Sequence, residues 1–201
     1  MKGESGVSRV DPTGGWSAWA PLKEPLFRSL WTANLISNIG GWMQAVGAAW
    51  LMTSLSSSPL MVTMVQASSS LPIVLLALPA GALADIADRR RILLFSQFWM
   101  MSAAAALTYL VFKGAISPIL LLALTGALGI GTALMGPAAQ AVITELVPSS
   151  QLGSAVSLNS VGFNLARAVG PALGGIILAQ TGAGYTFLLN SVSFLVVILV
   201  L

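Results

Sequence analysis

Apolar residues run in long unbroken stretches along this chain, and polar or charged residues gather in the short segments between them. No lysine, arginine, aspartate or glutamate occurs between Arg28 and Asp85, between Arg91 and Lys113, or between Lys113 and Glu145. A membrane-spanning helix needs about 20 predominantly apolar residues. The first gap is long enough for two such helices and has a Ser-Ser-Ser-Pro break near its middle, and a Gly-Ala-Gly break divides the apolar region after Glu145. We therefore expect six spanning helices, at about 29–53, 60–83, 92–112, 118–142, 152–178 and 185–201.

The apolar runs are continuous and rich in leucine and alanine. This pattern argues against a membrane β-barrel, whose strands alternate in polarity over segments of about ten residues. The composition agrees with the helical interpretation, because 56% of the residues are hydrophobic and only 7% are charged. An ordinary soluble domain has about 25% charged residues. A chain this poor in charge cannot cover a surface that faces water, so the sequence predicts an all-α membrane protein.

The chain contains no cysteine and no histidine. This excludes disulfides, thiolate chemistry and the commonest zinc sites within these residues, and we expect neither a metal nor a cofactor. A membrane-embedded enzyme needs a nucleophile, a metal or paired carboxylates at membrane depth. The predicted spans contain no aspartate or glutamate, so we assign no catalytic residue. The net charge is only +3, and we attribute it to membrane topology and expect no nucleic-acid partner.

Lysine and arginine collect in the cytoplasmic loops of membrane proteins. Residues 1–28 contain four of them, and Arg89, Arg90 and Arg91 follow the second predicted span. A cytoplasmic N-terminus brings all of these to the inner side and leaves only Lys113 in an outer loop. We therefore expect residues 1–28 to form a cytoplasmic tail and residues 29–201 to form a transmembrane unit.

The segment GALADIADRRR, at 81–91, holds a large share of the few charged residues. The positive-inside rule accounts for its arginines, but acidic residues contribute little to that rule. Counting back from Asp85 in steps of four reaches Gly81 and Ala77, so one helix face carries small residues and ends in a carboxylate. A neighbouring helix can approach such a face closely and present its N-terminus to Asp85, where a negative charge is favoured. Arg89 lies one turn further and would pair with Asp85 if the helix continues.

The same segment resembles the signature loop of the major facilitator superfamily of secondary transporters, G-x-L-A-D-x-x-D/G-R-R/K between the second and third spans. The matching residues are Gly81, Leu83, Ala84, Asp85, Asp88, Arg89 and Arg90. Ile86 departs from the family, which often has a basic residue there, and Asp88 stands where glycine is commonest. The resemblance implies that Asp85 and the basic residues belong to a cytoplasmic gate that favours the outward-facing state.

In the fifth predicted span, every fourth residue is small. The stripe consists of Gly162, Ala166, Gly170 and Gly174. It predicts a close helix crossing, and Pro171 removes a backbone donor and bends the helix. The run of Gly170, Pro171, Gly174 and Gly175 resembles the antiporter motif of exporters in the superfamily, which implies efflux and a hinge or seal. The longer family pattern has glycines at Ser157 and Ala166, whose small side chains preserve the packing.

Two segments, NLISNIGGWMQAVGAAWL at 34–51 and LNSVGFNLARAVGPALGG at 158–175, look like the branch of bacterial efflux transporters that contains the enterobactin exporter, and the resemblance covers most of residues 25–201. Members of the superfamily have two six-span halves with the cargo cavity between them, and each half has two inverted three-helix repeats. The resemblance implies an N-terminal half in the bacterial inner membrane and a second six-helix half as its partner. It also implies a small-molecule cargo, amphipathic or anionic, that is exported by alternating access.

Several polar residues lie within the predicted spans. Arg167, near the middle of one, costs about 2.5–3.5 kcal/mol on insertion scales. It either snorkels or is paired structurally, or it lies in a cavity beside an anionic cargo or a coupling carboxylate. Asn34, Asn38 and Gln44 either line a cargo path or bond to neighbouring helices. Glu145 is either a solvated loop carboxylate or the inner-face partner of the three arginines.

The usual proton-coupling motif of the family has an arginine where this chain has Thr125, four residues ahead of Gly129. The chain therefore offers no obvious proton carrier. Two functions remain: a transporter half, or a truncated, non-transporting or regulatory half that retains the motifs as packing features. The coding sequence beyond codon 201 distinguishes them, because six further spans support the transporter.

Overall fold

The computed structural model describes residues 18–201, so most of the expected cytoplasmic tail, residues 1–17, lies outside the described part of the chain. Residues 18–201 contain six α-helices, two short 3-10 helices and no strand. The α-helices are α1 (Pro25–Leu55), α2 (Pro59–Ile86), α3 (Arg89–Phe112), α4 (Pro118–Leu146), α5 (Leu152–Thr181) and α6 (Ala183–Val200). The 3-10 helices are η1 (Ala20–Lys23) and η2 (Ser149–Gln151). The all-helical architecture predicted from the sequence is confirmed for this part of the chain.

Proline and glycine mark several of the helix boundaries. Pro25, Pro59 and Pro118 occupy the first turn of α1, α2 and α4. A proline is tolerated there because the first N–H groups of a helix have no intrahelical partner. Gly114 follows α3 with φ 63°, and Gly182 joins α5 to α6 with φ 88°. Glycine adopts such positive φ values without the steric penalty of a Cβ atom, so these two residues allow the sharp reversals.

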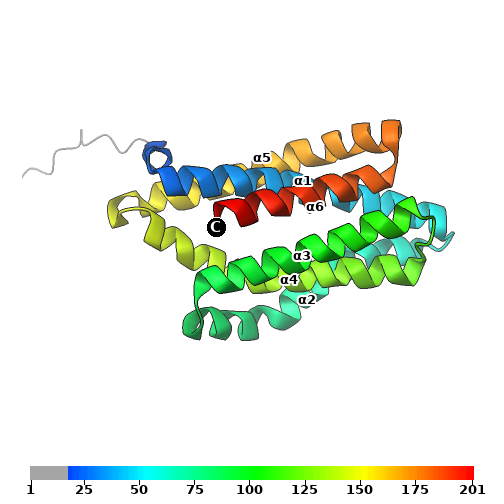
Figure 1. The fold of residues 1–201 in the computed structure, drawn as a ribbon, viewed down its shortest axis with the longest axis horizontal. Coiled ribbons are helices and arrows are strands. Elements are labelled where there is room, and N and C mark those ends of the chain that lie inside the picture. Colours follow the sequence, from blue (N-terminus) through cyan, green and yellow to red (C-terminus); the bar gives the residue numbers. More distant parts are fainter. Residues whose placement is uncertain (1–17) are drawn as a thin grey trace, which may run out of the picture.

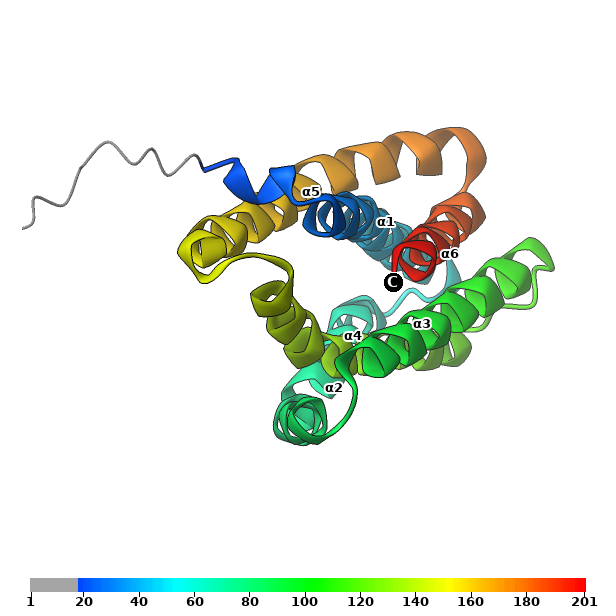
Figure 2. The same cartoon turned by 60° about the vertical axis from the view of Figure 1, so that its left-hand side comes forward.

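The helices form two groups of three, seen from two directions in Figures 1 and 2. Helix α1 packs against α5 and α6, α4 packs against α2 and α3, and a long α3–α6 contact joins the groups. One end of the bundle, on the left in Figure 1, carries the start of α1, the α2–α3 and α4–α5 connections and the end of α6. The charged segment after α2 therefore lies at the same end of the bundle as the last turn of α4.

The interior combines apolar packing with buried polar groups. Met52, Leu107, Leu121 and Phe187, from α1, α3, α4 and α6, are fully buried in one apolar cluster. Among residues 18–201, nine polar side chains are also buried: Gln44, Ser96, Gln97, Thr108, Thr125, Thr186, Asn190, Ser191 and Ser193. Polar groups between membrane helices normally form hydrogen bonds to each other or to helix carbonyls. A buried polar group that lacks a partner therefore needs a separate explanation.

Five helices in the described part of the chain, α2 to α6, are long and apolar enough to cross a membrane. Helix α1 is 31 residues long but is not among them, because polar residues such as Asn34, Asn38 and Gln44 lower its hydropathy. Large apolar side chains cover the outside of the bundle, among them Val74 and Leu78 of α2. These features support a multi-pass membrane protein, and the crossing by α1 stays a prediction.

Candidate functional site

The charged segment forms a tight connection between two helices. Helix α2 ends at Ile86, and α3 begins at Arg89. Asp88 is the N-cap of α3, because its Oδ1 accepts a hydrogen bond from the backbone N–H of Arg91 at 2.9 Å. Such a cap satisfies one of the free N–H groups of the first helical turn. Asp88 therefore has a local structural role at the position where glycine is the commonest family residue.

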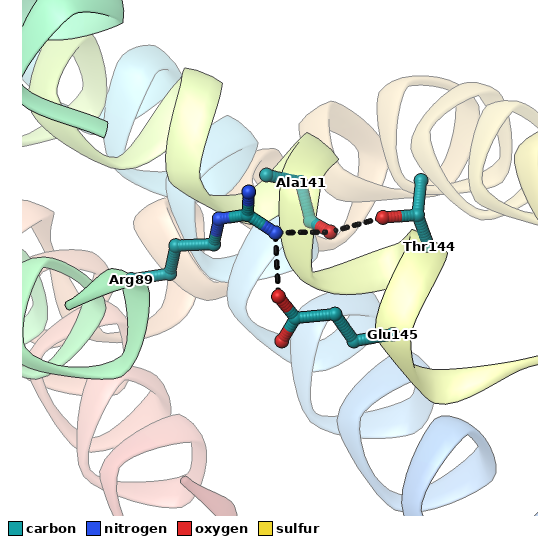
Figure 3. A network of polar contacts seen from close by, with 4 residues as sticks. All are labelled: Arg89, Ala141, Thr144 and Glu145. Atoms are coloured by element: carbon teal, nitrogen blue, oxygen red, sulfur yellow. Dashed lines mark hydrogen bonds and ion pairs between the residues drawn. The ribbon is translucent and has the colours of Figure 1, made fainter. Parts of the chain in front are cut away.

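Arg89 and Glu145 meet between the start of α3 and the last turn of α4 (Figure 3). Nη1 of Arg89 donates to Oε1 of Glu145 at 2.5 Å and to the carbonyl oxygen of Ala141 at 3.4 Å. The hydroxyl of Thr144 donates to the same carbonyl at 2.7 Å. The two charged side chains are 36% and 60% exposed, and an exposed ion pair contributes at most about 1 kcal/mol to stability. The network therefore connects the start of α3 to the end of α4 but adds little to the stability of the fold.

The expected pairing of Asp85 with Arg89 is wrong in this structure. It required α2 to continue for a further turn, but the helix ends at Ile86 and Arg89 turns to Glu145. The connection through residues 87–88 redirects the chain, so the two side chains do not share a helix face.

The helix face that ends in Asp85 has no neighbour within residues 18–201. Ala77 and Asp85 are exposed, and a Cβ atom added at Gly81 would meet nothing within 4 Å. Leu83 and Arg90 are exposed as well. The signature residues thus surround an open helix face, and close packing against that face would need a helix from outside the described chain.

A wide cavity of about 690 Å³ opens at this end of the bundle. The charged residues that line it are Asp85, Asp88, Arg89, Arg90 and Glu145. The start of α1 and the end of α6 supply apolar walls through Leu26, Leu30 and Leu201. Within residues 18–201, no group of three or more His, Cys, Asp or Glu side chains is arranged to hold a metal ion.

The small-residue stripe of α5 lies directly against α1. A Cβ atom at Gly170 would come within 2.5 Å of the Trp42 Cβ and 3.1 Å of the Ile39 carbonyl oxygen. A Cβ atom at Gly174 would come within 2.9 Å of the Met43 Cα. Real Cβ atoms essentially never approach other atoms more closely than 3.0 Å. These two glycines therefore allow the backbones of α1 and α5 to approach each other closely.

The other two residues of the antiporter-like motif, Pro171 and Gly175, differ in their surroundings from Gly170 and Gly174. Pro171 is half-buried in the interior of α5. A Cβ atom at Gly175 would meet nothing within 4 Å. The motif thus combines two residues that pack on α1 with one that faces open space.

Arg167 is exposed, and it meets an aromatic ring that the sequence pattern does not reveal. Its Cζ atom lies 5.9 Å from the centroid of the Trp42 ring, within the range of a cation–π interaction. Phe163 packs edge-on against the same ring at 6.2 Å. The contact joins α5 to α1, and only the packing of these two helices identifies the partner.

A second cavity, of about 370 Å³, lies between α1, α2, α4 and α6 and is called the central cavity below. Asn38 and Gln44 line it, together with Ser37. Asn34 instead lines a smaller cavity of about 40 Å³ beside Gln97. A mostly apolar wall with a few polar groups is typical of small-molecule sites of about 300–1,000 Å³. The structure therefore gathers two of the three residues considered for a cargo path, Asn38 and Gln44, around this cavity.

Asn190 of α6 is a cavity residue that reasoning from the sequence missed. Its Nδ2 donates to Oε1 of Gln44, and the hydroxyl of Ser193 donates to the backbone carbonyl of Asn190 at 2.7 Å and lies 3.3 Å from its Oδ1. Gln44 and Asn190 are only 4% and 2% exposed, and both line the central cavity. The sequence signal that could have found Asn190 is the polar run Asn-Ser-x-Ser in the middle of an otherwise apolar helix.

Comparison with known proteins places these features in a family. A family described as transmembrane secretion effectors matches residues 16–201. Together with the transporter relatives described below, this match covers nearly all of the chain. The chain belongs to the major facilitator superfamily. The resemblance seen in the signature loop is thereby confirmed, and the relatives are transporters, which are not enzymes.

Three relatives illustrate the kinds of transporter that this chain resembles. It is 30% identical to the staphyloferrin A transporter of Staphylococcus aureus, over 84% of this chain and 43% of that protein. It is 27% identical to the multidrug efflux pump Tap of Mycobacterium tuberculosis, over 81% and 40%. It is 26% identical to macrolide efflux protein A of Streptococcus pyogenes, over 71% and 36%. The chain thus spans about two fifths of the length of the curated relatives it matches.

Proposed function

We propose that this chain is the N-terminal half of an exporter that moves small amphipathic molecules out of a bacterial cell by alternating access. The central cavity carries this proposal, because its size and its largely apolar wall suit such a cargo. Two of the relatives are named as a multidrug efflux pump and a macrolide efflux protein, which favours export over uptake. The N-terminus and the charged connection after α2 would face the cytoplasm.

The helix contacts support two inverted three-helix repeats. Exchanging α1, α2 and α3 with α4, α5 and α6 maps the α1–α5 contact onto the α4–α2 contact. The same exchange maps the α1–α6 contact onto the α4–α3 contact and leaves the α3–α6 contact in place. On this basis α1 would cross the membrane like its counterpart α4, which gives six spans between residues 29 and 201.

Exposed helix faces support a second six-helix half as the partner. Helix α2 buries only Val65, Ala80 and Ala84 within the described chain. The α2 face that ends in Asp85 would receive the N-terminus of a helix from the second half, which favours a negative charge there. Arg167 is exposed beside the Trp42 ring. Its guanidinium would bind an anionic group of the cargo or a carboxylate of the second half.

Export itself is tested with Nile red, an uncharged amphipathic dye. We expect cells that express the full-length protein to lose preloaded Nile red faster than cells with an empty vector. Retention of the dye at the vector rate would contradict the exporter, and faster accumulation of the dye would reverse the direction. Fluorescence decay after removal of external dye measures the rate.

The gate is tested by the change Asp85→Asn in the full-length protein. Loss of the negative charge should remove the attraction to the approaching helix N-terminus and shift the protein toward the inward-open state. The 201 residues contain no cysteine, and Gly41 lines the central cavity with nothing within 4 Å of an added Cβ. We expect a cysteine at Gly41→Cys to react faster with a thiol reagent from the cytoplasmic side in the Asp85→Asn variant. Asp85→Glu keeps the charge and is the matched control; equal labelling of all variants would count against the gate.

A further inference from the structure

We propose that the central cavity contains a subsite for an uncharged, hydrogen-bond-accepting oxygen of the cargo, such as a ketone, ester or amide carbonyl. The amide N–H groups of Gln44 and the hydroxyl of Thr125 form this subsite, and Asn190 is a positioning residue that fixes the direction of the Gln44 amide. The inference rests on the proposed function, because it takes the central cavity as the cargo site. It adds the hydrogen-bond chemistry by which cargo is selected.

The direction of the Gln44 amide follows from its neighbours on α6. Nδ2 of Asn190 donates to Oε1 of Gln44, and the Ser193 hydroxyl, which donates to the backbone carbonyl of Asn190 at 2.7 Å, also lies 3.3 Å from Oδ1 of Asn190. A Cβ atom at Gly40 would come within 2.8 Å of Asn190 Oδ1, so the pair is packed closely against α1. The oxygen of Gln44 is thus occupied, and its Nε2 has no acceptor among residues 18–201. Gln44 therefore presents two N–H donors at the wall of the cavity.

Thr125 provides an independent observation on the same cavity. Its side chain is only 6% exposed, and its hydroxyl has no hydrogen-bond partner within the described residues. Thr108 and Thr132, by contrast, donate to the carbonyl four residues earlier in their helices, at 2.8 and 3.0 Å. A buried polar group without a partner is unfavourable, because its desolvation is not compensated by a hydrogen bond. An acceptor oxygen of the cargo that reaches this hydroxyl would remove that cost, since Thr125 and Gln44 both line the central cavity.

The walls of the cavity determine the charge of this oxygen. No lysine, arginine, aspartate or glutamate is among the described residues that line the central cavity. A carboxylate placed there would lose its hydration without gaining a cation, which is strongly unfavourable. Ile73 and Phe194 contribute to the apolar part of the wall. The subsite therefore suits an amphipathic molecule with a neutral carbonyl oxygen better than an anion.

The test uses the purified full-length protein in detergent and two matched fluorescent probes. One is 6-propionyl-2-dimethylaminonaphthalene, a ketone, and the other is its 6-propyl analogue, which lacks the carbonyl oxygen. We expect the protein to prefer the ketone, and Gln44→Met and Thr125→Val each to weaken ketone binding by about three- to tenfold. Binding of the propyl analogue should not change. Thr125→Val nearly preserves the side-chain volume and keeps the test decisive if another variant does not fold.

The role of Asn190 is tested by the ratio of the affinity for the ketone to the affinity for the propyl analogue. Asn190→Leu should lower the preference for the ketone, and combining it with Gln44→Met should lower the preference no further, because Asn190 acts through Gln44. Equal losses for both probes, no preference for the ketone, or tighter binding of the corresponding 6-carboxylate would overturn the proposal. If Nile red is not exported but the ketone preference persists, the exporter fails and the subsite stands. If Nile red is exported without a ketone preference, the subsite fails and the exporter stands.

Discussion

Gly129→Ala should destabilise the chain by about 1–3 kcal/mol, the usual range for an overpacked contact. Gly129 lies where α4 crosses α2, and an added Cβ atom would overlap the carbonyl oxygen of Ser69 and come within 3.1 Å of its carbonyl carbon. Both atoms belong to the backbone of α2, so no side-chain rotation relieves the overlap. The two helices would have to separate along one of the most extensive contacts in the bundle.

Two further glycines of α4 provide graded controls for this prediction. A Cβ atom at Gly131 would overlap Cγ of Met100. The methionine side chain is flexible and can move aside, so Gly131→Ala should lower the free energy of unfolding less than Gly129→Ala does. A Cβ atom at Gly136 would meet nothing within 4 Å, so Gly136→Ala should lose no stability. Thermal unfolding of the purified chain in detergent, followed by circular dichroism, measures the series. Equal stability of the Gly129 and Gly136 variants would show that the α2–α4 crossing is looser than these distances imply.

The helices could be predicted from the sequence because lipid leaves the backbone few alternatives. Every backbone polar group in the hydrocarbon must be satisfied internally, so a long charge-free run becomes a helix whatever its neighbours are. Pro59 and Pro118 mark helix starts by a local mechanism. The same reasoning overestimated the apolar character of α1, whose polar residues lower its hydropathy. Asn38 and Gln44 among them line the central cavity, so the weakest apolar run contributes most directly to the candidate site.

The contacts of the site residues could be predicted only in part, because they depend on which helices become neighbours. The meeting of Arg89 with Glu145 is one of the two alternatives that the sequence leaves open for Glu145, and it follows from their expected common side of the membrane. The break after Ile86, which prevents Asp85 from pairing with Arg89, is set by the cap at Asp88 and has no periodic signal. The partners of Trp42 and Gln44 come from α5 and α6, more than 100 positions away along the chain. Long-range pairs of this kind require the packed structure.

Gly174→Leu and Gly175→Leu should separate the two roles of the antiporter-like motif. At Gly174 an added Cβ atom would come within 2.9 Å of the Met43 backbone, whereas at Gly175 it would meet nothing within 4 Å. We therefore expect Gly174→Leu to force α5 away from α1 and destabilise the isolated chain by about 1–3 kcal/mol or more. Gly175→Leu should leave the thermal stability of the isolated chain unchanged.

The full-length protein should give a different order of effects. If a second six-helix half packs on the open face of α5, a leucine at Gly175 would obstruct that contact, because small residues allow the closest approach of membrane helices. We expect Gly175→Leu to slow Nile red efflux although the chain itself remains stable, and Gly175→Ala to retain most of the activity. Efflux at the unaltered rate with Gly175→Leu would mean that this face of α5 meets lipid, and the sealing role of the motif would then rest on Gly170 and Gly174 alone.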